Sequence, residues 1–242
     1  MKLALVTGGH RRLGAFISAR LAADGWTLAI HGARDANPDA ALAGVLGDWH
    51  GFVADLSDSD AVAGLIPAVV AHFGAAPSLL VNNASVFDDD NAQTITAEAI
   101  AAHHAVNTQA PVALALALAK AGGVGSVVNI LDQRVRNPVA DQLSYTLSKT
   151  ALAGMTRTLA VSLAPKLRVN AVAPGLTLPT AEYDAAQMAR IAEAMPLGVL
   201  PRPEDIADAV AFLAGATAIT GQTLFVDGGA SLKSFDRDFV YL

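Results

Sequence analysis

The sequence has no cysteine, which excludes disulfide bonds, thiolate nucleophiles and metal sites with sulfur ligands. Positive charge is also scarce, because 16 Lys and Arg residues stand against 22 Asp and Glu residues, a formal net charge of −6. Proteins that grip nucleic acid by its phosphates need a basic surface, so we expect no nucleic-acid partner. A small anionic cofactor would need only a few local cations.

Long hydrophobic runs are absent as well. The longest covers residues 112–119 and stops at Lys120, which is too short to span a bilayer. Near the N-terminus, one lysine and the apolar residues 3–6 are too short for a signal-peptide core and favour a first strand. We therefore expect a cytoplasmic protein with no membrane partner.

Apolar residues, by contrast, make up 53% of the chain against 16% charged residues, which suits a sheet covered on both faces. A chain of 242 residues can form one such α/β domain. Short apolar runs alternate with helical stretches and end at Gly, Asn, Asp or Pro; they cover residues 3–6, 27–30, 51–54, 79–81, 126–130, 168–172 and 223–226. The alternation predicts a single-domain α/β fold with a doubly wound, seven-stranded parallel Rossmann sheet.

Within this one domain, residues 1–242, we expect a cofactor half over about residues 1–125 and a catalytic half over about residues 126–242. Residues 176–200 lack strand character and follow a strand end, so we interpret them as a lid over the substrate. Ligands of such sheets bind beyond the carboxyl ends of the strands. Candidate site residues are therefore sought where strands end.

The first strand is followed by the segment Thr7-Gly8-Gly9-His10-Arg11-Arg12-Leu13-Gly14 and then by an amphipathic helix to about residue 23. Glycines at a strand-to-helix turn let the backbone approach a pyrophosphate, which the helix N-terminus then holds. Arg12 replaces the usual central glycine, so a plain tight turn stays an alternative. Two adjacent arginines favour a binding site for an anion at this turn.

The second strand ends near Arg34, where an NAD enzyme would carry an acid for the ribose hydroxyls. Arg34 and Arg11 could instead bind a 2′-phosphate, which favours NADP. Asp35, the residue after Arg34, could bind the ribose hydroxyls, so NAD is still a possible cofactor. The alternative to any cofactor role is that these charged residues lie in a solvated loop. Asp55, after the third strand, could bond the adenine edge, or serve only as a turn or helix cap.

Tyr145 and Lys149 are four residues apart, which places them on the same face of one helix. A phenol is a poor acid–base catalyst near neutral pH unless a neighbouring cation favours its phenolate. Lys149 could supply that charge. The spacing alone is common by chance, so the interpretation depends on the motifs around it.

Those motifs occur in a known order over nearly the whole chain: residues 7–14, Asn82-Asn83-Ala84, Asn107, Tyr145 with Lys149, residues 168–175 and residues 226–229. Together they resemble the short-chain dehydrogenase/reductase family. The resemblance implies that Asn83 and Ala84 pass under the cofactor riboses, that Asn107 holds a water relay and that Lys149 bonds the nicotinamide ribose. It also implies a homotetramer. The implied cofactor residues are Gly8, His10, Arg11, Arg12, Leu13, Arg34, Asp55, Leu56, Asn83, Ala84, Ser85, Tyr145, Lys149, Pro174 and Gly175.

Asp132 departs from this family, whose members carry a serine thirteen residues before the tyrosine. A serine hydroxyl can donate to a substrate carbonyl, whereas an ionised carboxylate only accepts and repels developing alkoxide charge. Asp132 suits a substrate with an N–H group, or a proton relayed to a ring nitrogen. A simple ketone fits poorly unless Asp132 is protonated.

Arg12, Ser85, Phe87 and Asp132 resemble the pteridine reductase and dihydromonapterin reductase branch of the family. By that resemblance Phe87 stacks on a pterin, Arg12 contacts the pterin oxygen and a cofactor phosphate, and Ser85 bonds the pterin edge. Ordinary loop packing is the alternative for Phe87. The expected substrate-binding residues are Arg12, Ser85, Phe87, Asp132 and Tyr145, and the expected catalytic residues are Asp132, Tyr145, Lys149 and Asn107.

We therefore predict an NADPH-dependent reductase that transfers hydride to a pterin-like C=N bond, with proton transfer by Tyr145 and Lys149 oriented by Asp132. The alternatives are a carbonyl reductase for a 3-oxoacyl thioester or small ketone, and a non-catalytic sensor of NADP or pterin. We expect no metal, since residues 88–90 suit a loop and His103 and His104 a helix. Arg134 and Arg136 could bind an anionic substrate tail or lie in a solvated loop.

Overall fold

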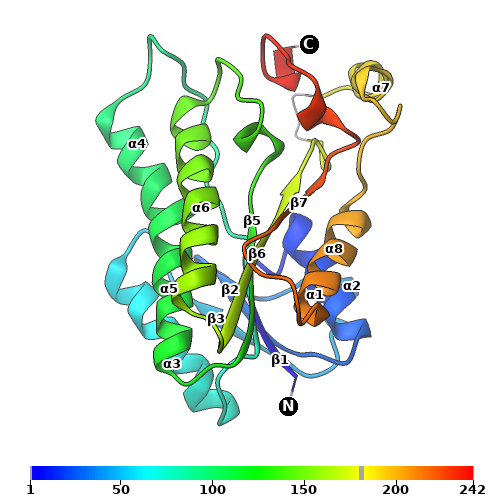
Figure 1. Ribbon diagram of the computed structural model, residues 1–242. Coiled ribbons are helices and arrows are strands. Elements are labelled where there is room, and N and C mark those ends of the chain that lie inside the picture. Colours follow the sequence, from blue (N-terminus) through cyan, green and yellow to red (C-terminus); the bar gives the residue numbers. More distant parts are fainter. Residues whose placement is uncertain (1, 180–182, 242) are drawn as a thin grey trace.

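The computed structural model describes residues 2–179 and 183–241 (Figure 1). Seven strands among these residues form one sheet, with the order β3-β2-β1-β4-β5-β6-β7. All neighbouring strands are parallel. The strands are β1 Leu3–Thr7, β2 Thr27–Gly32, β3 Trp49–Val53, β4 Leu79–Asn82, β5 Gly125–Ile130, β6 Leu167–Pro174 and β7 Thr223–Val226. The predicted sheet is therefore confirmed.

Helices cover both faces of the sheet (Figure 1). They are α1 Arg12–Ala23, α2 Ala40–Ala43, α3 Ser59–Phe73, α4 Ala97–His104, α5 Ala110–Lys120, α6 Leu143–Ser162, α7 Ala185–Ala194 and α8 Pro203–Gly215. Successive strand residues point to opposite faces, so Leu3 and Leu5 pack with α3, α5 and α6, whereas Ala4 and Val6 pack with α1 and α8. Two apolar layers explain why the central strands are continuously apolar.

The third strand differs from its prediction: it covers Trp49–Val53 rather than residues 51–54. It is the edge strand beside β2, and Trp49 pairs with Leu28. Its side chains are half-buried or exposed. Backbone pairing rather than burial sets where this strand starts, and an apolar run does not mark that point.

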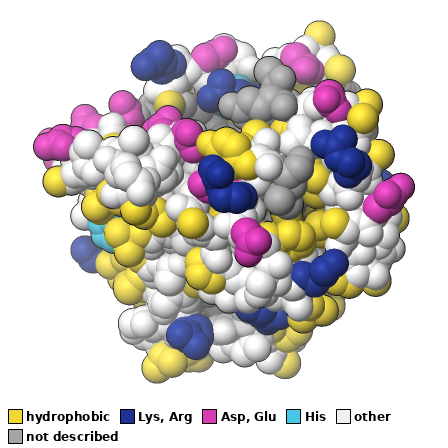
Figure 2. All heavy atoms as spheres, turned by 90° about the horizontal axis from the view of Figure 1, so that it is seen from above, with side chains coloured by type: hydrophobic (Ala, Val, Ile, Leu, Met, Phe, Trp, Pro, Cys, Tyr) yellow, Lys and Arg dark blue, Asp and Glu magenta, His cyan; other side chains and the backbone are white. Residues whose placement is uncertain are grey.

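The order of the strands creates a crevice between β1 and β4, because the chain winds outward from these neighbours in opposite directions. Figure 2 shows the molecule from the end at which the strands finish. Acidic side chains gather toward one edge of that face, and basic side chains are scattered over it (Figure 2). In the described part of the chain, no helix has the length and apolar character needed to cross a membrane.

The expected lid, residues 176–200, contains helix α7, and its residues 180–182 lie outside the described part. Ile191 and Met195 are buried against Phe239 near the C-terminus. The segment thus packs against the end of the chain, and its role as a lid stays a hypothesis.

Candidate active site

A cavity of about 1100 Å³ lies at the carboxyl ends of the strands. Its walls come from the loops after strands β1 to β6, from helix α6 and from the C-terminal residues. The predicted site residues that line it are Gly8, His10, Arg11, Arg12, Leu13, Asp55, Leu56, Asn83, Ala84, Ser85, Phe87, Asp132, Tyr145, Lys149, Pro174 and Gly175. Arg34 and Asn107 are not among the lining residues. The fold thus brings most of the predicted site together from strand ends far apart in the sequence.

The glycine turn is held tightly against the end of β4. Asn83 donates from Nδ2 to the Thr7 carbonyl at 2.9 Å, and Thr7 Oγ1 accepts from the Asn83 and Ala84 amides. Gly8 has a φ of +62°, and a Cβ on Gly14 would lie 2.0 Å from the Gly8 carbonyl oxygen. Only glycine lets helix α1 start this close to the turn.

Arg12 occupies the usual glycine position with a φ of +48°. A residue with a Cβ in this left-handed conformation costs roughly 1 kcal/mol or more. The chain accepts that cost at the cavity wall, where the guanidinium is exposed. The arrangement favours a role for this arginine beyond that of a turn residue.

His31, at the end of β2, belongs to this site although sequence reasoning missed it. Its Nε2 lies 2.8 Å from the Ala54 carbonyl oxygen, and the Gly8 amide donates to Nδ1 at 3.3 Å. Because a carbonyl needs a donor and an amide an acceptor, the proton sits on Nε2. Burial lowers the pKa of His31, so the ring is neutral. In the sequence, His31 is a polar residue that directly follows the apolar run of the second strand, and this position could have marked it as a site residue.

The outer end of the cavity has features that suit an adenosine phosphate. His10 Nδ1 is buried without a hydrogen-bond partner among the described residues, and Arg11 is exposed beside it. Asp35 turns to its own loop, because Oδ1 accepts from the Asn37 amide and side chain at 3.0 and 2.7 Å. These bonds lower the pKa of Asp35. His10 offers an unpaired ring nitrogen and Arg11 a positive charge, and the carboxylate of Asp35 is directed into its own loop. These features suit a dinucleotide that carries an additional phosphate, as NADP does.

Arg34 and Asp55 lie at the rim of this end. Arg34 is exposed, and its charge acts on Asp55. Asp55 Oδ1 accepts from the Ser57 amide at 2.9 Å and from its hydroxyl at 2.8 Å, and these bonds lower the pKa of Asp55. The carboxylate of Asp55 thus stabilises the turn after β3, which was the alternative to binding the adenine edge. Asp55 nevertheless lines the cavity.

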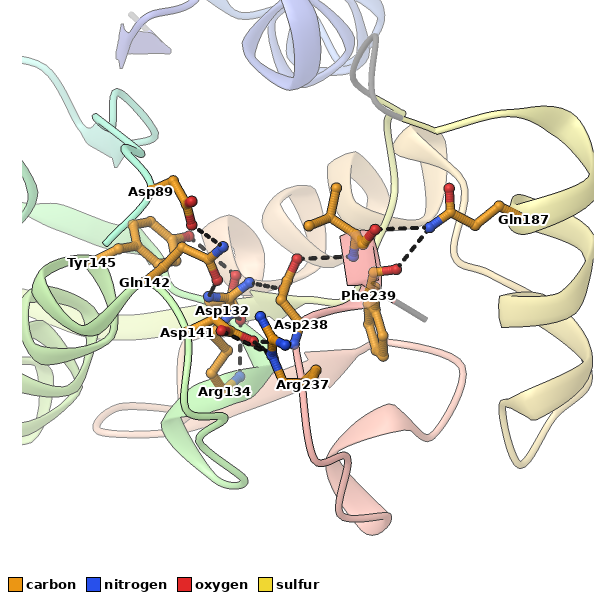
Figure 3. Close-up of polar contacts among 11 residues, drawn as sticks. Asp89, Asp132, Arg134, Asp141, Gln142, Tyr145, Gln187, Arg237, Asp238 and Phe239 are labelled. Carbon is orange, nitrogen blue, oxygen red and sulfur yellow. Dashed lines mark hydrogen bonds and ion pairs between the residues drawn. The ribbon is translucent and has the colours of Figure 1, made fainter. Parts of the chain in front are cut away.

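At the inner end, Tyr145 and Asp132 are directly bonded. The phenol donates to Asp132 Oδ2 at 3.1 Å (Figure 3). Burial and then the Asp132 charge raise the pKa of Tyr145 well above its usual value. This shift is opposite to the expectation that a neighbouring cation favours the phenolate. The physical reason is that the hydroxyl is removed from water and faces a carboxylate, so it is held as a proton donor.

Lys149 shares helix α6 with Tyr145 and lines the same cavity. Its Nζ donates to the Ile130 carbonyl oxygen at 2.9 Å and lies 5.6 Å from the centre of the Tyr145 ring. Burial lowers the pKa of Lys149 to about 8. The predicted pairing on one helix face is therefore present, but the ammonium is partly neutralised at mildly alkaline pH.

Arg134 is buried, which contradicts the solvated-loop interpretation. Its amide donates to Asp132 Oδ1 at 2.9 Å, its Nη1 donates to Gln142 at 2.9 Å, and it forms an ion pair with Asp238. Arg136 lies 3.8 Å from the centre of the Phe225 ring. The Arg134 guanidinium already has polar partners in the chain, which counts against its binding an anionic substrate tail, whereas Arg136 is exposed, as the solvated-loop interpretation expects.

Asn107 lies in the π-helical turn Ala105–Gln109 and is fully buried. Its side chain accepts from the Val86 amide and Ser85 hydroxyl and donates to the Val86 carbonyl and Ser148 hydroxyl. Asn107 thereby braces the loop that carries Phe87. Phe87 is 51% exposed, and its ring meets the Tyr145 ring edge-on at 4.7 Å.

In the residues that the structure covers, no three His, Cys, Asp or Glu side chains are grouped to hold an ion. His103 Nε2 accepts from the Asp88 amide, and its Nδ1 lies 2.9 Å from the Ala99 carbonyl oxygen. Both ring nitrogens are therefore already in use.

Residues 238–241 also line the cavity, together with Gln142 and Tyr183, and none of these had been predicted. The chain after β7 folds back over the site, which no periodicity in that segment indicates. The available signal was a run of three consecutive charged residues flanked by aromatic residues, at residues 235–241.

Comparisons with known proteins agree with the site. Residues 9–231 match the family model described as Enoyl-(Acyl carrier protein) reductase. The short-chain dehydrogenase/reductase of Serratia marcescens BCRC 10948 has a TM-score of 0.85 and 32% identity, with 95% of this chain and 98% of that chain covered. The chain belongs to the short-chain dehydrogenase/reductase family. The resemblance inferred from the motifs is thus confirmed, and the protein is an NAD(P)-dependent oxidoreductase.

Two further relatives differ in the activity for which they are named. FolM alternative dihydrofolate reductase 1 from Brucella canis, solved with NADP, has 39% identity and a TM-score of 0.88, with 96% of this chain and 94% of that chain covered. The (3R)-3-hydroxyacyl-CoA dehydrogenase of Mus musculus is 34% identical over 247 residues, 94% of this chain and 95% of that protein. This chain is similar to both relatives to a comparable degree. The comparisons therefore do not choose between a pterin and a thioester substrate, and that choice depends on the residues of the site.

Proposed function

We propose that this short-chain dehydrogenase/reductase uses NADPH to reduce a C=N bond in a pterin-like heteroaromatic ring. The observation that carries the proposal is the hydrogen bond from Tyr145 to the carboxylate of Asp132 inside the cavity. A carboxylate can accept from the N–H groups of a pterin edge, whereas it repels the alkoxide that forms from a ketone.

NADP fits the residues at the outer end of the cavity. His10, Arg11 and Arg34 would meet the 2′-phosphate, and the backbone from Gly8 to Gly14 would hold the pyrophosphate. Lys149 would bond the nicotinamide ribose. When bound, NADPH supplies the hydride that reduces the carbon of the C=N bond.

Proton delivery falls to the protein. Tyr145 exchanges its hydrogen bond from Asp132 to the ring nitrogen, the phenolic O–H bond breaks, and a new N–H bond forms on the substrate. Asp132 holds the phenol in place beforehand and then accepts from the substrate edge. The raised pKa of Tyr145 keeps the phenol protonated at neutral pH, so it is a weak acid that gives up its proton only as the substrate nitrogen gains negative charge from the hydride.

Binding of a flat ring would use Phe87, Arg12 and Ser85 at the cavity mouth. The half-exposed Phe87 ring offers a face for stacking. Similarity to a FolM alternative dihydrofolate reductase solved with NADP supports this substrate class and cofactor. Similarity to a (3R)-3-hydroxyacyl-CoA dehydrogenase favours a carbonyl reductase as the second candidate.

A spectrophotometric assay separates these candidates. Purified protein should oxidise NADPH with 7,8-dihydropterins, and acetoacetyl thioesters should react much more slowly or not at all. Tyr145→Phe should abolish turnover, and Phe87→Ala should raise the KM for the pterin while the KM for NADPH stays unchanged. Thioester turnover without any response to pterins would refute the substrate class, and ligand binding without turnover would favour a sensor.

We also propose a homotetramer, as the family resemblance implies. Support comes from large apolar side chains left exposed on α5, α6 and α8, namely Leu116, Leu147, Val161 and Phe212. Light scattering on purified protein should give four times the mass of the chain. The cytoplasmic location expected from the sequence stays a prediction.

A further inference from the structure

The C-terminal residues 235–241 lie at the end of the sheet where the strands finish (Figure 1), and residues 238–241 line the active-site cavity. In this segment Asp238 is 6% exposed and forms an ion pair with Arg134, which is also 6% exposed. The two residues are 104 positions apart. A buried ion pair between such distant residues fixes the segment to the turn that carries Asp132.

Arg134 stands between two carboxylates. Its Nη1 donates to Gln142 and its Nη2 to Asp238, while its Nε lies 3.5 Å from Asp132 Oδ1 (Figure 3). Two arms of the guanidinium are thus directed away from Asp132. That orientation leaves Asp132 Oδ2 to accept from Tyr145.

Asp238 is itself held from both sides. The Asp238 amide donates to Asp141 at 2.9 Å, and Asp141 also accepts from Arg237 Nε at 2.8 Å. On the other side, Gln187 of helix α7 donates to the carbonyls of Phe239 and Val240 at 3.2 and 3.0 Å (Figure 3). Asp238 is therefore a fixed point for the arginine.

We propose that Asp238 is a positioning residue for proton transfer: it holds Arg134 so that Asp132 stays bonded to Tyr145. The inference rests on the roles proposed above for Tyr145 and Asp132. Without the Asp238 carboxylate, Nη2 of Arg134 loses its partner and is free to join Nε on Asp132, while Nη1 stays bonded to Gln142. Arginine and carboxylate form strong two-pronged pairs, and such a pair would compete with the phenol for the acceptor.

The charges that face Tyr145 give the direction of the effect. Asp132 and Asp238 raise the pKa of Tyr145, and Arg134 lowers it. Three further titratable groups lie around this site. Lys149 Nζ lies against the Tyr145 ring, Tyr183 faces Arg134, and Asp89 accepts a hydrogen bond from Gln142 Nε2. Loss of the Asp238 charge therefore lowers the pKa of Tyr145, both directly and by releasing Arg134.

Asp238→Asn in the full-length protein tests this. The Tyr145 phenol is titrated by its near-ultraviolet absorbance, with Tyr145→Phe as the blank, and the pH profile of kcat is recorded in parallel. We expect the titration and the alkaline limb of the profile to move down by about one pH unit, with a several-fold loss of kcat at neutral pH. Asp236→Asn, which removes an exposed charge from the same segment, should match wild type.

An unshifted titration, or an equal loss of activity at every pH, would mean that Asp238 serves only the fold and would overturn the proposal. Asp238→Glu, which keeps the charge, should restore the wild-type profile. If Asp238→Asn does not fold, Arg134→Gln is compared with the double variant Arg134→Gln/Asp238→Asn. Because no arginine is left to turn onto Asp132, the double variant should keep the kcat of Arg134→Gln at neutral pH, and a further several-fold loss would overturn the inference.

The titration needs no substrate, so it separates this inference from the proposed function. A Tyr145→Phe variant that still reduces pterins would defeat the proposed function. The absorbance titration would even then decide whether Asp238 acts on Tyr145.

Discussion

The phenol of Tyr145 donates a hydrogen bond to Asp132 Oδ2 at 3.1 Å, which couples helix α6 to the turn after β5. In most family members the same position carries a hydroxyl, by the resemblance described above. The substitution changes a group that can donate into one that only accepts. Substrate choice should therefore follow this residue.

Asp132→Ser should lower pterin turnover by about tenfold or more, because the phenol loses the charged acceptor that orients it and the substrate N–H groups lose the carboxylate. The same variant should gain activity on acetoacetyl thioesters, since a serine hydroxyl can donate to a carbonyl. Both rates are measured by NADPH oxidation. Asp88→Ser, which removes an exposed acid nearby, serves as the control. Equal rates for wild type and Asp132→Ser would show that Asp132 is a bystander.

Arg12 has a left-handed backbone, so its replacement separates conformation from chemistry. Arg12→Gly and Arg12→Ala should raise the KM for NADPH equally, because both lack the guanidinium. Only Arg12→Gly relieves the strain, so it should be about 1 kcal/mol more stable to denaturant than Arg12→Ala. A glycine variant no more stable than the alanine variant would show that the turn carries no strain.

Arg34 is exposed at the rim of the cavity and should act only on the 2′-phosphate. A hydrogen bond to a charged group contributes about 1.5–3 kcal/mol. Arg34→Ala should therefore raise the KM for NADPH by about tenfold or more and leave the KM for NADH nearly unchanged. Steady-state kinetics with both cofactors check this, and equal changes would defeat the 2′-phosphate role.

Lys149 should make stability depend on pH in a defined direction. Its pKa is lowered to about 8 in the folded protein, below the usual value of 10.5. Between these values the folded chain has lost a proton that the unfolded chain keeps, so this group makes the free energy of unfolding rise with pH. Denaturant unfolding from pH 7 to 10 should show that the free energy of unfolding of wild type increases relative to that of Lys149→Met. A constant difference would show that the lysine titrates normally.

Much of the fold was predictable because burial leaves a pattern. Strands β1 and β4 to β6 are buried on both faces, so each appears as a short, mainly apolar run. The motif residues Gly8, Asn83 and Tyr145 follow from such strand ends or from helical spacing. Edge strand β3 was misplaced because pairing with β2, not burial, sets its start.

The sequence by itself determined the sheet, the family and the residues of one helix face, since these depend on local periodicity and on motifs of a few residues. Only the tertiary structure decided which charges surround Tyr145. The raised pKa of the phenol, the burial of Arg134 and its pairing with Asp238 arise from contacts between distant segments. Such contacts are set by how the packed elements bring side chains together and by exclusion of water, and neither is written in the spacing of residues along the chain.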